Sequence, residues 1–306
     1  MKALKFSRKQ LGIPYAVFIG LFVVLPLLLI VLYAFTVERG EPTTNDVTKF
    51  SFSFENFVYF FGSSANIRAI YVSFGLAIVT TAICLLVAYP VAYILARSKM
   101  KWRNVILMLF ILPMWINFVL RTAAMKELLF KIGMYRSSKL SMVNTVIGMV
   151  YDYLPFTILP LYTVLIKLDK SILEASADLG ATGAQTFFKV VIPLSAPGIV
   201  SAITMVLLPT TTSYVVSDTL GNGNVTIIGK LIEDQFSTMF DWHAGSAIAM
   251  ISTREEADYG KENTQNFIYR PRPRVYLRAD SSPHDLFFQP LAVNRYLVEG
   301  MGLRAL

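Results

Sequence analysis

Asp152 is the residue whose type and place best suit chemistry, because it puts a carboxylate inside an apolar stretch. It lies between Tyr151 and Tyr153 in a mainly apolar run from 142 to 168. An acid at membrane depth is costly when it faces lipid, so it marks a functional site by default. We therefore predict a functional role for Asp152. The alternative is an ion pair with a basic residue of the same chain.

Other polar candidates lie near the ends of apolar runs. Asp218 follows one such run and either caps a loop or attracts a cation at an opening. Trp115, Asn117, Tyr151 and Tyr214 are amphipathic residues at membrane depth. Such residues more often pack or anchor a helix at the interface than bind a ligand, so we treat them as second-rank candidates.

A polar segment between two apolar runs has the pattern of a short capped helix. Ser171 followed by Glu174 is the spacing of a capping box, in which hydroxyl and carboxylate satisfy free amides at a helix start. Gly180 is a residue type that ends helices. The spacing predicts a helix over 171–179.

A second short helix is expected directly after it. Thr182 with Gln185 repeats the capping spacing. Pro193 is expected to stop this helix from running on into the next apolar run. The sequence therefore predicts a helical hairpin, which either docks onto a partner or is a connection without one.

The elements that must position these residues are membrane helices. The chain has 306 residues, 55% hydrophobic and only 16% charged, against about 25% charged in soluble domains. Runs long enough for a bilayer, which needs about 20 residues, lie at 11–36, 69–96, 104–124, 142–168 and 195–216. We expect five spans, interrupted and bent by Pro90, Pro113, Pro155, Pro160 and Pro209.

Basic residues indicate the orientation of these spans. They cluster at 2–9, 97–103 and 167–189, beside the first, second and fourth runs. Cytoplasmic loops are enriched in Lys and Arg, so we predict a cytoplasmic N-terminus. This clustering also explains the net charge of +8 without nucleic-acid binding.

Several kinds of chemistry find no support in the sequence. No Gly-rich phosphate-binding loop with its lysine is present. His243 and His284 are isolated, and the single cysteine, Cys84, lies in an apolar run. We predict no enzymatic activity, no cofactor and no bound metal.

The predicted hairpin resembles the signature loop of permease subunits of binding-protein-dependent ABC importers. That loop runs Glu-Ala-Ala, three residues, Gly, nine residues, then Ile-x-Leu-Pro. Glu174, Ala175, Gly180 and Pro193 match it in register, and Ser176 replaces an alanine. The stretches around 112–122, 154–162 and 214–245 resemble the spermidine/putrescine type of this family.

The resemblance implies an all-α bundle that forms half of a polyamine path in a bacterial cell membrane. Its partners would be cytoplasmic ATPase subunits, a second homologous permease and an extracytoplasmic polyamine-binding protein. The residues implied in ATPase coupling are Glu174, Ala175, Ser176, Asp178, Gly180 and Pro193. The residues implied in the substrate path are Asp152, Tyr151, Trp115, Asn117, Tyr214 and Asp218.

The C-terminal part departs from that pattern. A sixth span is expected from about residue 245, but the apolar run ends after Ile251. We predict a permease domain over 1–251, with the hairpin at 169–193, a truncated sixth span and a disordered polar tail over 252–306. Two alternatives stay open: a stand-alone secondary carrier or channel, and a truncated permease without activity.

Overall fold

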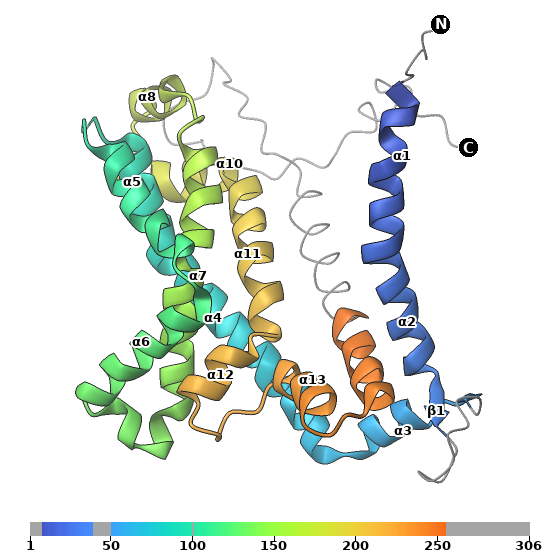
Figure 1. Ribbon diagram of the computed structural model, residues 1–306. Helices are drawn as coiled ribbons and strands as arrows, with labels where there is room; N and C mark the ends of the chain where they lie inside the picture. The colour runs from blue at the N-terminus through green and yellow to red at the C-terminus, as the bar shows by residue number, and fades with distance from the viewer. Residues whose placement is uncertain (1–7, 39–49, 100, 255–306) are drawn as a thin grey trace, which may run out of the picture.

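The computed structural model describes residues 8–38, 50–99 and 101–254 as a helical bundle with one small β-hairpin (Figure 1). The first elements are α1 (Arg8–Ile19), α2 (Leu25–Ala34), β1 (Thr36–Glu38), β2 (Phe50–Phe52), α3 (Glu55–Gly62), α4 (Ser64–Arg97), α5 (Arg103–Ile111) and α6 (Phe118–Lys131). The later elements are α7 (Ser141–Leu165), α8 (Lys170–Asp178), α9 (Gly183–Thr186), α10 (Ile192–Leu194), α11 (Ala196–Thr211), α12 (Tyr214–Leu220) and α13 (Ile228–Ser237). The two strands pair antiparallel.

Helices α4, α7 and α11 pack on one another to form the centre of the bundle. Their shared core includes Ala92, Ile158, Leu161 and Ala202. Small residues let helices approach closely in membranes. At Gly198 of α11, a Cβ would lie only 3.0 Å from the Val164 side chain of α7, so the close contact between these two helices depends on that glycine.

The N-terminal span stands apart from this centre. Residues Pro14–Ala34 form a continuous apolar helix, and none of the residues in its most apolar 18-residue stretch is buried. In Figure 1 it lies to one side of α7 and α11. It is held at its end, where the Thr36 hydroxyl and the His243 ring lie 3.1 Å apart. Its exposed apolar surface suits contact with lipid or with another subunit.

Three described helices are long and apolar enough to cross a membrane: Pro14–Ala34, Ser64–Arg97 and Ser138–Leu165. These agree with the first, second and fourth predicted spans. Two further pairs of helices are long and apolar enough only when both members of a pair are counted as one span. Arg103–Trp115 and Phe118–Lys131 meet at 99°, and Gly183–Leu194 and Ala196–Thr211 meet at 66°. The described residues therefore hold three candidate spans, or up to five if each bent pair is one span.

The third predicted span, 104–124, is wrong as a single helix. The chain tightens into a 3-10 turn at Leu112–Trp115 and turns sharply before α6. Pro113 opens that turn, where its missing N–H is tolerated. The other four prolines do not end helices: α4, α7 and α11 continue through them.

The fifth predicted span, 195–216, ends early, at Thr211. Thr210 donates its hydroxyl hydrogen bond to the carbonyls of Val206 and Leu207, at 2.7 and 2.9 Å. Thr211 donates to the carbonyl of Leu208 at 2.7 Å. Of these carbonyls, that of Leu208 belongs to the last four of α11, which lack amide partners within the helix. The chain then starts α12 at Tyr214.

The C-terminal part of the described chain is also helical. Residues 242–254 are helical, beyond the predicted end of the apolar run. Ile248 and Ile251 pack there with Phe60 and Ile228. The predicted tail lies outside the described residues from 255 onward, and the domain boundary at 251 stays a prediction.

Candidate functional site

The break between α5 and α6 leaves polar groups outside a helix. Ile116 is extended, and the Asn117 side chain accepts hydrogen bonds from the amides of Val119 and Leu120, at 2.9 and 3.3 Å. Asn117 is therefore the N-cap of α6. Non-helical backbone at membrane depth is tolerated only where protein or a water-filled cavity covers it.

A buried ion pair lies directly beside the break. Arg121 Nη2 of α6 is 3.3 Å from Asp152 Oδ1 of α7, and the two side chains are 5% and 1% exposed. The Thr122 hydroxyl donates to Asp152 Oδ2 at 3.2 Å. Asp152 thus pairs within its own chain, which is the alternative that the sequence left open. Its role in a substrate path stays a prediction.

A pocket of about 460 Å3 contains this ion pair. Its lining residues are Met114, Trp115, Ile116, Asn117, Phe118, Arg121, Asp152, Tyr153 and Phe156. Three predicted path residues, Asp152, Trp115 and Asn117, are therefore brought together. Trp115 is 85% exposed, so one side of the pocket is open on this subunit.

Tyr153, not Tyr151, lines the pocket. The Tyr153 hydroxyl donates to the carbonyl of Pro209 at 3.4 Å, near the end of α11, whereas Tyr151 is exposed on α7 and does not line the pocket. The α5–α6 break and the end of α11 therefore both meet α7 at one turn. Discontinuous helices that meet at midplane are typical of transporter binding sites.

Tyr214 and Asp218 lie away from the pocket, on α12. Asp218 is 3.6 Å from Lys230 of α13, which also contacts Glu233 and Asp234 at 2.7 and 3.0 Å. The hydrogen bond to Glu233 is the main cause that raises the pKa of Lys230, and the same bond lowers the pKa of Glu233. Asp218 is a helical residue in an ionic cluster, not a loop cap.

Sequence reasoning missed Arg121, Thr122 and Tyr153. A signal for the first was present, because Arg121 is a base within the apolar run 104–124, and an intramembrane base calls for an acid partner. Helical spacing places Phe156, four residues on, beside Asp152 on α7. The pairing itself depends on how α6 folds back, which no local pattern shows.

The hairpin is present, but its first cap differs from the prediction. The N-cap of α8 is Asp169, whose Oδ1 accepts from the Ser171 amide at 3.0 Å. The predicted Ser171–Glu174 capping box is therefore wrong: a carboxylate two residues earlier already satisfies that amide, and Ser171 is a residue of the first helical turn. This hydrogen bond from the Ser171 amide lowers the pKa of Asp169 below its ordinary value of 3.8.

Two further local signals of the hairpin are confirmed, the glycine stop and the second capping box. Gly180 has a φ of +78°, and the amides of Gly180 and Ala181 bond to the carbonyls of Ala177 and Ser176, at 2.9 and 3.1 Å. This is the glycine-dependent Schellman end of a helix. The capping box of Thr182 and Gln185 is complete.

Side-chain exposure divides the predicted coupling residues into two groups. Four of the side chains and Gly180 are exposed: Glu174, Ala175, Asp178, Gly180 and Pro193. Ser176 is buried, and its hydroxyl lies 2.8 Å from that of Thr186, joining the two helices of the hairpin. Ser176 therefore holds the hairpin together and is not available to a partner in this conformation.

Pro193 does not break the second helix as predicted. The chain passes from a π-helical turn, Phe187–Val191, into α10, and the break comes at Ser195. Pro193 lies in the first turn of α10, where a missing N–H is tolerated. The 66° bend to α11 follows that break.

The hairpin is anchored firmly to the bundle. The Phe187 ring makes edge contacts with Tyr89 and Tyr93 of α4, with ring centres 5.5 and 5.2 Å apart. The hydroxyls of Tyr89 and Ser195 lie 2.6 Å apart in a buried hydrogen bond. Arg97 Nη1 also donates to the Leu168 carbonyl at 3.1 Å. Movement of the hairpin must therefore carry these helices with it.

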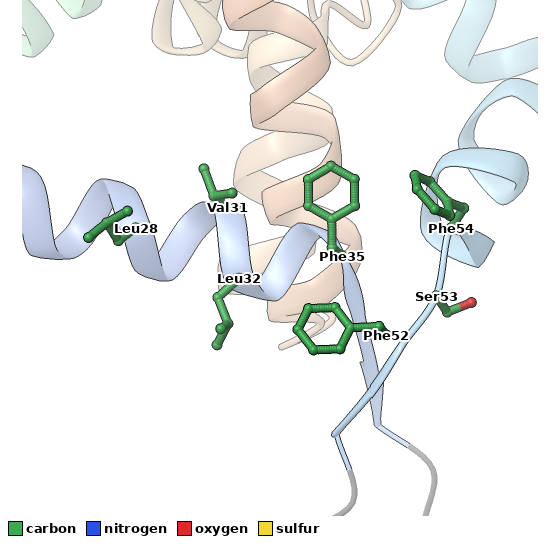
Figure 2. Close-up of a pocket in the computed structure, with 7 residues that line it drawn as sticks. All are labelled: Leu28, Val31, Leu32, Phe35, Phe52, Ser53 and Phe54. Atoms are coloured by element: carbon green, nitrogen blue, oxygen red, sulfur yellow. The ribbon is translucent and has the colours of Figure 1, made fainter.

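A second pocket lies where α2 meets the β-hairpin, and Figure 2 shows its lining side chains. Its lining residues are Leu28, Val31, Leu32, Phe35, Phe52, Ser53 and Phe54. Only Ser53 among them is polar, and none is ionisable. This pocket has the composition of a lipid-facing surface and offers no group for recognising a charged ligand.

Comparison with known proteins identifies the family. Residues 88–253 match the family described as binding-protein-dependent transport system inner membrane component. The chain belongs to this family. It is thus a multi-pass membrane protein of a transport system and not an enzyme. The matched region contains the hairpin and the pocket with the Arg121–Asp152 pair.

Curated relatives and a solved structure agree with the assignment. The spermidine/putrescine transport system permease protein PotB of Haemophilus influenzae is 34% identical over 259 residues, 80% of this chain and 88% of that protein. PotB of Escherichia coli K12 is 37% identical over 194 residues, 59% of this chain and 70% of that protein. A chain of a bacterial alginate ABC transporter, in complex with an alginate pentasaccharide-bound periplasmic protein, has a TM-score of 0.66 at 14% identity, covering 86% of this chain and 95% of that one. The last comparison shows the ABC importer permease fold.

Proposed function

We propose that this chain is the membrane-spanning permease subunit of an ATP-driven polyamine importer of the spermidine/putrescine type. It forms half of the translocation path and couples to a cytoplasmic ATPase through the hairpin at 171–193. The substrate class is supported by the two PotB relatives, which are 34% and 37% identical.

The observation that carries the coupling role is the combination of exposure and anchoring in the hairpin. Glu174, Ala175 and Asp178 are exposed on a helix with ordered ends. Phe187 and Val191 of the same segment pack into the core shared by α4, α7 and α11. A force applied to the exposed face is therefore passed to the helices at the centre of the bundle.

Exposed apolar groups on the hairpin support a docking role. Leu179 and Phe188 are both largely exposed although their segment is polar. Apolar side chains at the core of a polar rim are typical of protein–protein contacts. ATP hydrolysis takes place in the separate ATPase subunits, which turn the closure of a nucleotide-bound pair into movement of the hairpin.

The proposed importer includes two further partners and has a defined orientation in the membrane. A second, homologous permease completes the path, and an extracytoplasmic polyamine-binding protein delivers the substrate. The N-terminus is cytoplasmic, in a bacterial inner membrane. In support, the start of α1, the start of α5 and helices α8 and α10 lie at one end of the molecule (Figure 1), where the positive-inside rule places basic segments.

The substrate path consists of Asp152 with Trp115 and Asn117 at the α5–α6 break, and of Tyr151, Tyr214 and Asp218 farther out. Polyamines are multiply charged cations, so carboxylates and aromatic faces suit their passage. The first three residues share one pocket, which supports their assignment more strongly than that of the others.

Transport by a reconstituted importer tests this function. Proteoliposomes containing this chain, its second permease and the ATPase should take up radiolabelled spermidine when ATP and the binding protein are supplied. An ATPase subunit that binds but does not hydrolyse ATP is the matched control and should give no uptake. Uptake by this chain alone, driven by an ion gradient without ATP, would instead identify a secondary carrier.

A further inference from the structure

The Arg121–Asp152 pair leaves some of its own polar atoms unsatisfied. Arg121 Nε and Nη1 and Asp152 Oδ1 are buried and have no hydrogen-bond partner among the described residues. Arg121 Nη2 and Asp152 Oδ1 lie 3.3 Å apart and form an ion pair, but Oδ1 accepts no hydrogen bond from it. Since buried polar atoms without partners are costly, a ligand that satisfies Asp152 Oδ1 gains free energy that the resting pair does not supply.

The surroundings of the pair suit a cation. Phe118, Tyr153, Phe156 and the exposed Trp115 line the same pocket. Aromatic faces attract ammonium groups, most strongly where water is excluded. Asp152 is the acidic residue of this lining, so a ligand that competes for it must be positively charged.

Arg121 also contacts an aromatic ring beside the pocket, that of Phe118. Its guanidinium carbon lies 5.8 Å from the centre of the Phe118 ring, within the range of a cation–π contact. Phe118 is at the start of α6, one helical turn before Arg121. A small rotation of the Arg121 side chain therefore moves it off Asp152 while keeping a favourable contact.

We propose that an ammonium group of the transported polyamine displaces Arg121 from Asp152 Oδ1 inside this pocket, so that Arg121 holds the site as an internal substitute for the substrate. The inference rests on the proposed polyamine transport. In the empty state the carboxylate keeps a counterion and the pocket has no net charge. In the loaded state the ammonium binds Asp152, and Arg121 rests on Phe118.

This exchange produces weak binding, which transport requires. Once the ammonium has entered, two cations share one carboxylate, and their mutual repulsion opposes tight binding. A site in a path must bind well enough to admit its substrate and weakly enough to release it. Return of Arg121 to Asp152 helps to expel the amine, so the site is reset without a proton transfer.

Thiol labelling in the assembled importer tests occupancy directly. The chain has one native cysteine, Cys84, which is buried, so an added thiol can be followed on this subunit. In the Ile116→Cys variant the thiol lines the pocket. Spermidine at about ten times its half-protecting concentration should slow modification by a neutral maleimide about tenfold. The matched control is Val119→Cys, an exposed position on α6 outside the lining, whose labelling should not change.

A paired variant separates substrate exchange from a purely structural ion pair. Single removal of one charge can prevent folding, because it leaves the other charge buried and unpaired. Arg121→Gln with Asp152→Asn removes both charges at once. The double variant should assemble with its partners, take up spermidine at less than about a tenth of the wild-type rate, and lose spermidine protection in the Ile116→Cys background.

Each outcome decides between the possibilities. Normal uptake by the double variant would overturn the exchange and leave the pair a structural one. Wild-type uptake of spermidine without protection at Ile116→Cys would also overturn it, while leaving polyamine transport intact. Absence of ATP-driven spermidine uptake by the wild-type importer would overturn the proposed function itself, and this inference with it.

Discussion

Glu174 lies exposed on the nine-residue helix α8, which has hydrogen bonds at both ends, whereas Asp152 lies 1% exposed where α7 packs against α6. The hairpin is built from bonds between near neighbours, such as Asp169 to Ser171 and Thr182 to Gln185. The pocket is built from contacts such as that of Thr122 with Asp152, 30 residues apart.

This difference in construction matches the different roles proposed for the two regions. The hairpin presents a preformed polar surface, on which we propose that the ATPase docks. The pocket holds two opposite charges, Arg121 and Asp152, that neutralise each other within the chain. Changes in the two regions should therefore differ both in the size of their effect and in how far along the chain it extends.

The largest effect is expected from removing one charge of the buried pair. Arg121→Leu leaves the Asp152 carboxylate without its counterion and should destabilise the importer by about 3–5 kcal/mol. Thermal unfolding of the purified complex measures this. Arg121→Leu combined with Asp152→Leu should recover most of the loss, and a double variant no more stable than the single one would contradict an internally neutralised pocket.

A smaller effect is expected where the hairpin joins the bundle. Tyr89→Phe removes the buried hydroxyl that bonds Ser195, although Ser195 keeps its own bond to the Ile192 carbonyl at 3.0 Å. The expected cost is about 1 kcal/mol in thermal unfolding. Tyr93→Phe, which keeps its edge contact with Phe187, is the control and should cost less. Equal costs would show that the hydrogen bond adds nothing to the joint.

A local effect is expected within the hairpin. Thr182→Ala removes one side of the capping box and should weaken the start of α9 by about 1 kcal/mol. Amide hydrogen exchange at Gln185 should quicken, with the spans unchanged. Thr163→Ala, on an exposed face of α7, serves as the control. Faster exchange spread across α4 and α7 would instead indicate that the hairpin is not a local unit.

The smallest effect is expected from protonating the N-cap. The pKa of Asp169 is lowered in the folded chain, so its stabilising effect is present above the ordinary value of 3.8 and is lost as the pH falls through the lowered pKa. Protection of the Ser171 amide, corrected for intrinsic exchange, should decline over that acidic window. The same decline in Asp169→Asn would exclude the carboxylate as its cause.

Local signals predicted the hairpin more fully than the pocket. Gly180, Thr182 and Gln185 act where their spacing indicated, because turns and caps depend on a few adjacent residues. Even there, Asp169 took the N-cap from Ser171, since the carboxylate two residues before that amide is a competing acceptor.

The long apolar runs indicated where the helices lie but not where they break. Pro90 and Pro155 look like breaks in the sequence, yet helices continue through both, whereas the turn at Pro113 bends the chain. Packing decides this outcome, because neighbouring helices can cover a freed carbonyl. The same long-range packing set Asp152 against Arg121, which sequence alone left as one of two alternatives.

If the hairpin passes movement from an ATPase to the substrate path, a charge reversal on its exposed face should stop transport. ATP-driven spermidine uptake by the reconstituted Glu174→Arg importer measures this. Glu127→Arg makes the same charge change at an exposed site of α6, at the other end of the molecule. We predict wild-type uptake for Glu127→Arg, and for Glu174→Arg uptake reduced by at least about tenfold, the equivalent of 1.4 kcal/mol. Uptake by Glu174→Arg at the wild-type rate would contradict the claim.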